Sequence, residues 1–273
     1  TDRVGNVLAV LRMTGAPASA AIPNASDGSA QDIQGLSVPA EAAAIAKAVT
    51  GAYLSSGGNA FSTRTASMIV QQHFPPARSA AGLESGPLSG VQFSQLPCSD
   101  LSARLAPGPA AMIGPKRSPL GLSADPGGFP LYKNGVVVGG IGVASDGTYG
   151  FDPEVIDVDI DSDERIALAG TVGFEAPIGV RANRISVDGT LLRYTDTDYA
   201  NLTAVAGASY AATVPALGNL SPVIGYFPLA AIQPGAVYGS EASGVRRATA
   251  TEFTNGDAFV LTDGSGGNRY PLR

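Results

Sequence analysis

The chain has 273 residues, of which 44% are hydrophobic and 15% charged, so it can fold around a sizeable core. Its net charge of −6 and its scattered lysines and arginines argue against a nucleic-acid partner. The single cysteine, Cys98, excludes an internal disulfide, and the single histidine, His73, excludes sites that need two imidazoles. No apolar run reaches the roughly 20 residues of a membrane helix, so we expect no membrane span.

The first part of the chain predicts a strand, a loop and a helix. Residues 7–13 are a short apolar run that we expect to form a strand. Residues 14–36 are rich in Ala, Ser, Asp and Gly and are predicted to be loop. The segment 37–56 carries strong helix signals, because Pro39 stands near its start and Glu41 lies in its first turn.

A second helix is predicted over the segment STRTASMIVQQHFPP, residues 62–76. Ser62 is a plausible N-cap, and the Pro-Pro pair at the end stops the helix. Helical spacing places one set of side chains on a common face: Ala66, Ile69, Val70 and His73. Residues 77–128 are rich in Pro, Gly and Ser, and we expect a long irregular excursion there.

Residues 129–144 predict the clearest element, a hairpin that turns at an Asn-Gly pair. Its second strand carries Gly139, Gly140 and Gly142, which are costly in a strand unless another backbone, a helix or a ligand approaches closely. We interpret the glycines of this strand as the place where a helix packs closely on the sheet, at the border of a pocket. The helix that carries Lys47 is its natural partner.

Two further elements are predicted downstream. The segment SDERIALAG, residues 162–170, reads as a helix that Ser162 caps. A second hairpin is expected at 183–196, turning at an Asp-Gly pair. The tail from Tyr199 contains short strand-like runs without a regular period.

The acidic segment DPEVIDVDIDSDE, residues 152–164, alternates aspartates as a calcium loop would. Ser162 replaces the glycine of an EF-hand loop, and Leu168 stands where its bidentate glutamate belongs. An EF-hand is therefore excluded. A cation site of another kind and a polar-edged strand that leads into the capped helix both stay open.

Four motifs occur in this chain: Ala-x-x-Lys-Ala on a predicted helix, Gly-Gly-x-Pro, Gly-x-x-x-Gly-Gly-Ile-Gly-Val, and Asp-Glu-x-x-Ala-x-x-Gly. Their residues are Ala44, Lys47 and Ala48; Gly127, Gly128 and Pro130; Gly135, Gly139, Gly140, Ile141, Gly142 and Val143; and Asp163, Glu164, Ala167 and Gly170. With these blocks the chain resembles the haem-binding GlcG/HbpS-like family, also called domain of unknown function 336. The opening TDRVGNVLAVLRM resembles the first hairpin of that family through Asp2, Gly5 and Ala9.

The resemblance implies an α+β domain at 1–180, with a mostly antiparallel sheet of about five strands, helices packed on it, and a long irregular insertion at 57–124. Residues 181–273 would be a C-terminal extension rich in strands and loops, packed on the same domain. Family members usually begin with a helix and a strand before the first turn. A missing N-terminal segment or a second chain is therefore expected to complete the sheet.

For function, the resemblance implies haem or a related tetrapyrrole as the ligand, and a homo-oligomer. The composition, with few lysines and abundant Gly, Ala, Ser and Pro, is typical of an exported bacterial protein, so we expect a periplasmic or secreted location. We predict an exported tetrapyrrole-binding protein that acts as an oligomeric binding or sensory module rather than as an enzyme. The alternative is a small-molecule binding protein or enzyme for hydroxy-acid-like ligands, with Lys47 as anion clamp or base.

His73 is the candidate axial ligand of the haem iron, because an imidazole beside apolar helix residues suits a haem pocket. Alternatively, it is a helix-end histidine bonded to a carbonyl. Cys98 is either a thiolate ligand or a small buried side chain. Gly139 and Gly140 are further candidate contacts of the cofactor.

The cations are open to two interpretations each. Arg117 is the candidate partner of the haem propionates, with Arg64, Arg78 and Lys116 as further possibilities, and each of them could instead be solvated. Lys47 either extends to water or is held near a pocket, where burial would lower its pKa. The sequence contains neither a Gly-x-Ser-x-Gly motif nor a phosphate loop, and Thr1 as an N-terminal nucleophile is the one catalytic alternative.

Overall fold

The computed structural model describes residues 1–25, 27–30, 33–80, 82, 115–202, 217–223, 232–255 and 257–271. These ranges contain three α-helices: α1 (Ala40–Tyr53), α2 (Thr63–Ile69) and α4 (Ser162–Gly170). The strands are β1 (Leu11–Met13), β2 (Ser19–Ala21), β3 (Ser37–Pro39), β4 (Gly128–Lys133), β5 (Val136–Gly142), β6 (Ser186–Val187), β7 (Thr190–Leu191), β8 (Gly218–Leu220), β9 (Val245–Arg247) and β10 (Phe259–Leu261). Single turns of 3₁₀-helix are η3 (Ile178–Val180), η4 (Ala182–Arg184), η5 (Tyr199–Asn201) and η6 (Glu241–Ser243).

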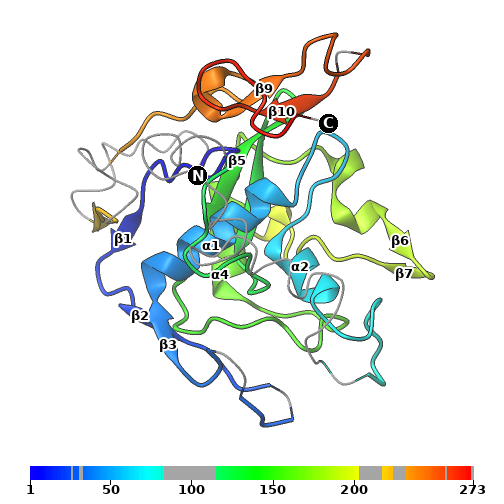
Figure 1. Ribbon diagram of the computed structural model, residues 1–273. Helices are drawn as coiled ribbons and strands as arrows, with labels where there is room; N and C mark the ends of the chain where they lie inside the picture. The colour runs from blue at the N-terminus through cyan, green and yellow to red at the C-terminus, as the bar shows by residue number, and fades with distance from the viewer. Residues whose placement is uncertain are drawn as a thin grey trace.

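The centre of the molecule is the β4–β5 hairpin with α1 lying across it (Figure 1). Asn134 and Gly135 connect the strands with φ angles of 52° and 78°, the left-handed values of a type I′ turn. The predicted hairpin is confirmed, and the helix predicted within 37–56 is confirmed over Ala40–Tyr53, whereas Ser37–Pro39 form β3. At the far end of the hairpin, Gly128 pairs with Gly142.

The glycines of β5 allow α1 to approach the strand at backbone distance. A Cβ atom at Gly140 would overlap the carbonyl oxygen of Ala48, and one at Gly142 would overlap that of Ala44. From the helix side, a Cβ at Gly51 would lie 2.5 Å from the carbonyl carbon of Phe129. The close helix-on-sheet contact predicted from the sequence is therefore confirmed, and the pocket beside it stays a prediction.

The strands do not form one sheet of about five strands, so that expectation is wrong. The described residues form five separate two-stranded antiparallel sheets: β1–β8, β2–β3, β4–β5, β6–β7 and β9–β10. Irregular backbone occupies both edges of the central hairpin. Thr1 and Gly140 exchange backbone hydrogen bonds along β5, and Tyr132 of β4 donates its N–H to Phe174. Neither neighbour continues as a strand, so the α+β class holds while the large sheet does not.

Both shorter helices begin with side-chain caps. Ser62 caps α2 in a capping box with Thr65, as predicted. Asp161, not Ser162, caps α4 by accepting the backbone N–H of Glu164, because the helix already starts at Ser162, one residue earlier than the sequence indicated. The segment before α4 forms turns rather than the strand that was one interpretation of the acidic run.

α2 is shorter than the sequence predicted, because it ends at Ile69 and not at the Pro-Pro pair. The side-chain amide of Gln71 donates to the carbonyls of Ser67 and Asp152, which ties the chain to the loop before α4. His73 therefore lies beyond the helix, and the prediction that it shares a helical face with Ile69 is wrong.

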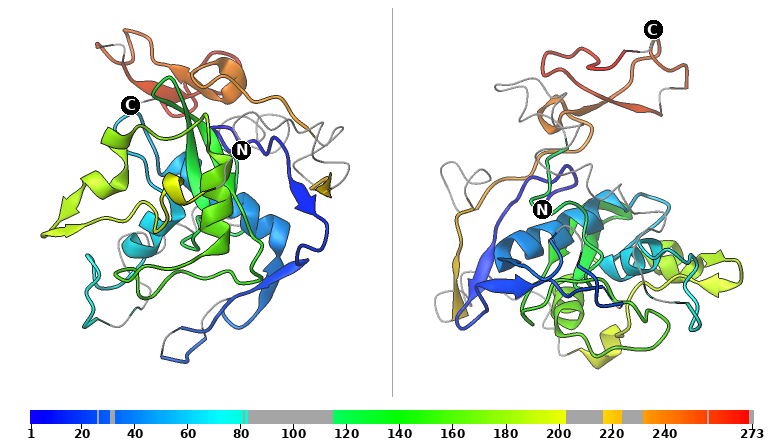
Figure 2. Two further views of the ribbon diagram at one scale, coloured as in Figure 1. Left: turned by 180° about the vertical axis from the view of Figure 1, so that it is seen from behind. Right: turned by 60° about the horizontal axis from the view of Figure 1, so that its bottom comes forward.

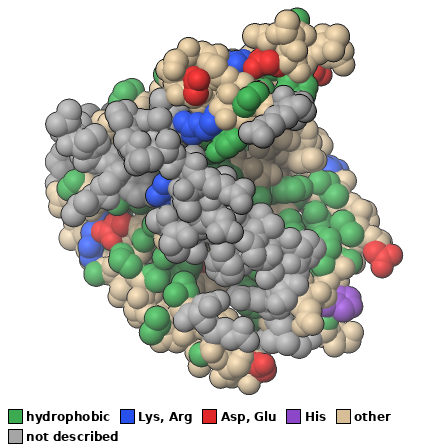
Figure 3. All heavy atoms as spheres, viewed as in Figure 1, with side chains coloured by type: hydrophobic (Ala, Val, Ile, Leu, Met, Phe, Trp, Pro, Cys, Tyr) green, Lys and Arg blue, Asp and Glu red, His purple; other side chains and the backbone are tan. Residues whose placement is uncertain are grey.

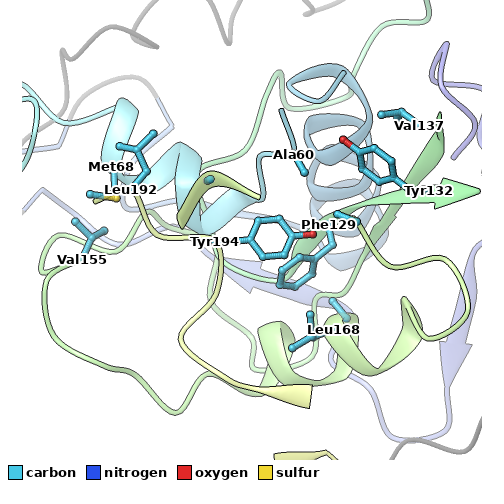
Figure 4. Packing of buried hydrophobic residues seen from close by; sticks show 12 residues of the cluster. Ala60, Met68, Phe129, Tyr132, Val137, Val155, Leu168, Leu192 and Tyr194 are labelled. Atoms are coloured by element: carbon cyan, nitrogen blue, oxygen red, sulfur yellow. The ribbon is translucent and has the colours of Figure 1, made fainter. Parts of the chain in front are cut away.

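The largest apolar cluster joins residues from both sides of the expected domain boundary at 180 (Figure 4). Phe129 and Tyr194 pack edge to face, with ring centroids 5.4 Å apart. Leu168 of α4 and Leu192 complete the same cluster. Residues just after 180 thus belong to the same core as β4 and α4.

The C-terminal hairpin β9–β10 lies at one end of the molecule and extends away from α1 and β4–β5 (Figure 2). It is connected to the first turn of the chain, where Ala236 donates its N–H to Asp2 and Arg3 lies 3.9 Å over the Tyr238 ring. In the described ranges, none of the helices has the length and hydropathy needed to cross a membrane.

Candidate functional site

Lys47 lies on α1, and its ammonium group is closed off from solvent. The residue is 0% exposed. Its Nζ lies 2.5 Å from Oδ2 of Asp125 and 2.8 Å from Oδ2 of Asp163. Asp125 precedes β4 and Asp163 stands in the first turn of α4, so the three side chains join α1, β4 and α4. We call Lys47, Asp125 and Asp163 the lysine cluster.

The two carboxylates decide the charge of Lys47. Burial by itself lowers its pKa, but the attraction of Asp125 and Asp163 outweighs burial and raises the pKa above its usual value. Burial raises the pKa of Asp125 to about 7, against the attraction of Lys47. The expected lowering of the Lys47 pKa is wrong, because the sequence did not reveal the two carboxylates. The alternative of a side chain that extends to water is also wrong, because the residue is fully buried.

The two carboxylates of the lysine cluster have different partners. Oδ1 of Asp163 accepts hydrogen bonds from the backbone N–H of Ser145 at 2.7 Å and from its hydroxyl at 2.5 Å, while Oδ2 accepts one from Lys47. Oδ1 of Asp125 accepts the N–H of Gly150 at 3.2 Å. Oδ2 of Asp125 is buried and forms the 2.5 Å ion pair with Nζ of Lys47, and the described residues offer it no other partner.

A second buried cation lies on α2. Arg64 is the largest fully buried side chain in the described residues. Its Nε and Nη2 lie 3.2 and 3.4 Å from the Glu164 carboxylate. Its Nη1 is 2.7 Å from Asp152, 3.0 Å from Asp159 and 3.3 Å from Asp196. We call these five residues the arginine cluster; burial lowers the Arg64 pKa, but Glu164 and the other carboxylates raise it overall.

The sequence reasoning missed this role of Arg64, which it considered as a propionate partner or a solvated residue. The guanidinium is surrounded by carboxylates of its own chain, so it does not serve either role. The signal that could have revealed it is the surplus of acids at 152–164.

Three carboxylates of the acidic segment lie close together. One oxygen each of Asp152, Asp157 and Asp159 falls within 4.8 Å of the others, a spacing that a metal ion could bridge. Arg64 already supplies a positive charge to two of the three. The group is therefore explained by the arginine cluster, and we assign no cation to it.

His73 is exposed on the surface (Figure 3). Its Nδ1 lies 2.7 Å from the carbonyl oxygen of Pro75, as the second interpretation of this residue predicted. A carbonyl only accepts, so Nδ1 is the donor, and in the neutral ring Nε2 presents the lone pair. His73 and Lys47 share no hydrogen-bond or ion-pair partner among the described residues, so the structure does not bring these two candidates together.

The other candidates have separate surroundings. A Cβ at Gly139 would overlap the carbonyl oxygen of Thr1, so the chain itself fills the space on that side of the strand. At Gly140 the backbone of α1 fills it, as described above. Arg117 is half-buried, and its pairing with propionates stays a prediction, as does a cofactor contact of either glycine. Arg78 is exposed, and Cys98 lies outside the described residues.

Comparison with known proteins gives no independent support for the family resemblance. No family model, no curated protein and no solved structure matches the chain. The relation to the GlcG/HbpS-like family stays a prediction that rests on the quoted sequence blocks.

Proposed function

We propose that this protein binds haem or a related iron tetrapyrrole, with Nε2 of His73 as an axial ligand. The observation that supports the proposal is the Nδ1–H donated to the Pro75 carbonyl at 2.7 Å. Histidines that ligate metals usually donate their other ring nitrogen to a carbonyl or carboxylate, which fixes the tautomer and raises the basicity of the ligating nitrogen. His73 has that arrangement and is exposed.

The surroundings of His73 also suit a flat apolar ligand. Phe74, which follows it, is half-buried and packs against the main apolar cluster. Hydrophobic side chains gather on the same face of the molecule as the histidine (Figure 3). A bound haem would supply the iron centre, and the chain would supply the axial nitrogen and an apolar surface for the porphyrin.

A haem titration with the protein in excess tests the proposal. The wild type should give a Soret band shifted from that of haem in buffer, and the His73→Ala variant should lose the shift. Gln72→Ala is the matched control, because Gln72 is the exposed neighbour of His73. An identical spectrum for wild type and His73→Ala would rule out ligation by this residue, and no shift in either would reject tetrapyrrole binding.

The alternative, a hydroxy-acid-like ligand held by Lys47, has less support from the geometry. A fully buried ammonium between two carboxylates has its charge already balanced and does not attract a third anion. A thermal-shift screen of small hydroxy acids tests it, and a flat screen counts against it. Oligomerisation and export stay predictions, which size-exclusion chromatography and fractionation of the native source would check.

A further inference from the structure

The lysine cluster brings a nucleophile, an electrophile and a proton acceptor together in the core. Lys47 Nζ contacts one carboxyl oxygen of each aspartate, at 2.5 and 2.8 Å. The exposed fractions of the three side chains are 0%, 8% and 1% for Lys47, Asp125 and Asp163. An amine held this close to a carboxyl group, with water excluded, is positioned for direct reaction.

The two aspartates have different roles in this arrangement. Asp163 accepts hydrogen bonds from Lys47 and twice from Ser145, so its Oδ2 is in direct contact with the Lys47 ammonium, whose proton it would receive. Asp125 approaches Lys47 more closely, but outside hydrogen-bond geometry, and its Oδ2 has no other partner in the described part of the chain. Both aspartates thus form ion pairs with the amine, and the Asp125 oxygen is the nearer of the two.

We propose that Lys47 and Asp125 condense into an intramolecular amide (isopeptide) bond, with Asp163 as the catalytic proton acceptor. The bond would connect the middle of α1 to the segment before β4, in the core of the described fold. This inference is independent of the proposed tetrapyrrole binding, because His73 has no part in it.

The reaction balances without an oxidant or any other reagent. The Lys47 ammonium gives one proton to Asp163, and the neutral Nζ attacks Cγ of the protonated Asp125 carboxyl group. The C–N bond forms, and the C–Oδ2 bond breaks. Asp163 delivers the transferred proton to the departing oxygen and then accepts the second proton of the nitrogen, so that one water molecule leaves, a neutral amide stays and Asp163 ends protonated.

The protonation states of Asp125 and Lys47 affect different steps of the condensation. Burial raises the pKa of Asp125 to about 7, so its protonated, electrophilic form is populated near neutral pH. The pKa of Lys47 is raised by the same carboxylates, so the proton transfer to Asp163 is the demanding step. The product replaces a buried ion pair with an uncharged amide, and removing charge from a desolvated site is favourable.

The intact mass of the full chain, measured after denaturation, tests the proposal. The wild type should weigh less than its sequence by one water molecule, and proteolysis should yield one branched peptide that joins Lys47 to Asp125. Lys47→Met and Asp125→Ala should each show the full sequence mass. Lys133→Met is the matched control, because Lys133 is exposed on the hairpin, and it should keep the loss.

Two further outcomes sharpen the result. A cyclic imide at Asp146-Gly147 or Asp188-Gly189 would lower the mass equally, but mild alkali opens an imide and leaves an amide intact. A loss reversed by alkali overturns the proposal, as does a wild type with the full sequence mass. Asp163→Ala keeps both reacting groups and should show the full mass; if it still loses water, the role of Asp163 as proton acceptor is wrong.

Discussion

Two buried cations, Lys47 and Arg64, are neutralised from adjacent positions of one helix, yet their surroundings differ. Asp163 and Glu164 are consecutive in the first turn of α4, and they face Lys47 and Arg64 respectively. One helix start thereby connects α1 through Asp163 and α2 through Glu164. The consecutive residues Asp163 and Glu164 thus belong to different clusters, Asp163 to the lysine cluster and Glu164 to the arginine cluster.

The clusters differ in their contact with water. In the lysine cluster every side chain is at most 8% exposed. In the arginine cluster, the side chain of Asp159 is 43% exposed. A closed cluster cannot rehydrate when a partner is removed, whereas an open one can. The comparison therefore predicts different costs for removing the two cations.

The largest effect is expected for Lys47→Met. The substitution leaves Asp125 and Asp163 facing each other in the core, and it also removes the proposed amide, which would close the long loop between residues 47 and 125. We expect the free energy of unfolding to fall by about 5 kcal/mol or more. Urea denaturation measures it, with Lys133→Met changing stability by less than about 0.5 kcal/mol. A small loss for Lys47→Met would mean that the cluster is open to solvent.

Arg64→Met should be the second-largest effect. It leaves Glu164 buried without its cation, whereas Asp196 keeps its ion pair with Arg193 and water can enter beside Asp159, which reduces the loss of stability. We expect a loss of about 3 kcal/mol in the same urea experiment. Arg184→Met is the control, because Arg184 is exposed. A loss larger than that of Lys47→Met would reverse the comparison between the clusters.

The sequence predicted local structure in this protein better than it predicted the buried charges. Turns and caps depend on neighbouring residues, so Asn134-Gly135 and the Ser62 cap were predicted correctly. The glycines of β5 also indicated a close contact with α1, because a strand without side chains needs a partner at backbone distance.

The features that the sequence did not predict depend on contacts between residues far apart in the chain. Arg64 and Glu164 are 100 positions apart, and no local pattern reports that they meet in the core. Lys47 stood out as an isolated cation, but the identity of its partners depends on how β4 and α4 pack. The prediction of one large sheet was wrong for the same reason, because the tertiary fold determines which strands pair with one another.

Gly140→Ala should disturb the lysine cluster without touching the arginine cluster. The new methyl group overlaps the carbonyl oxygen of Ala48, so α1, which carries Lys47, must move away from β5. We expect a loss of about 2 kcal/mol in thermal or urea unfolding. Gly179→Ala in η3 is the control, because nothing lies within 4 Å of its Cβ position. Equal stability of the two variants would mean that the helix contact is loose.

The smallest expected effect is a pH dependence that should distinguish the clusters. Burial raises the pKa of Glu164, so the folded chain holds a proton that the unfolded chain has already released. This contribution to stability is fully present below the unfolded pKa of about 4.3 and is lost as the pH rises through the folded pKa. The stability of wild type minus that of Glu164→Gln should therefore fall as the pH rises above about 4.

In the lysine cluster, a free Asp125 carboxyl group would behave in the same way, because its pKa is raised to about 7. An amide does not titrate, so with the proposed bond the difference between wild type and Asp125→Asn should stay flat from about pH 4 to 7. Urea midpoints across this range measure both differences. A slope for Asp125→Asn that matches the slope for Glu164→Gln would show a free carboxyl group in the core and contradict the bond.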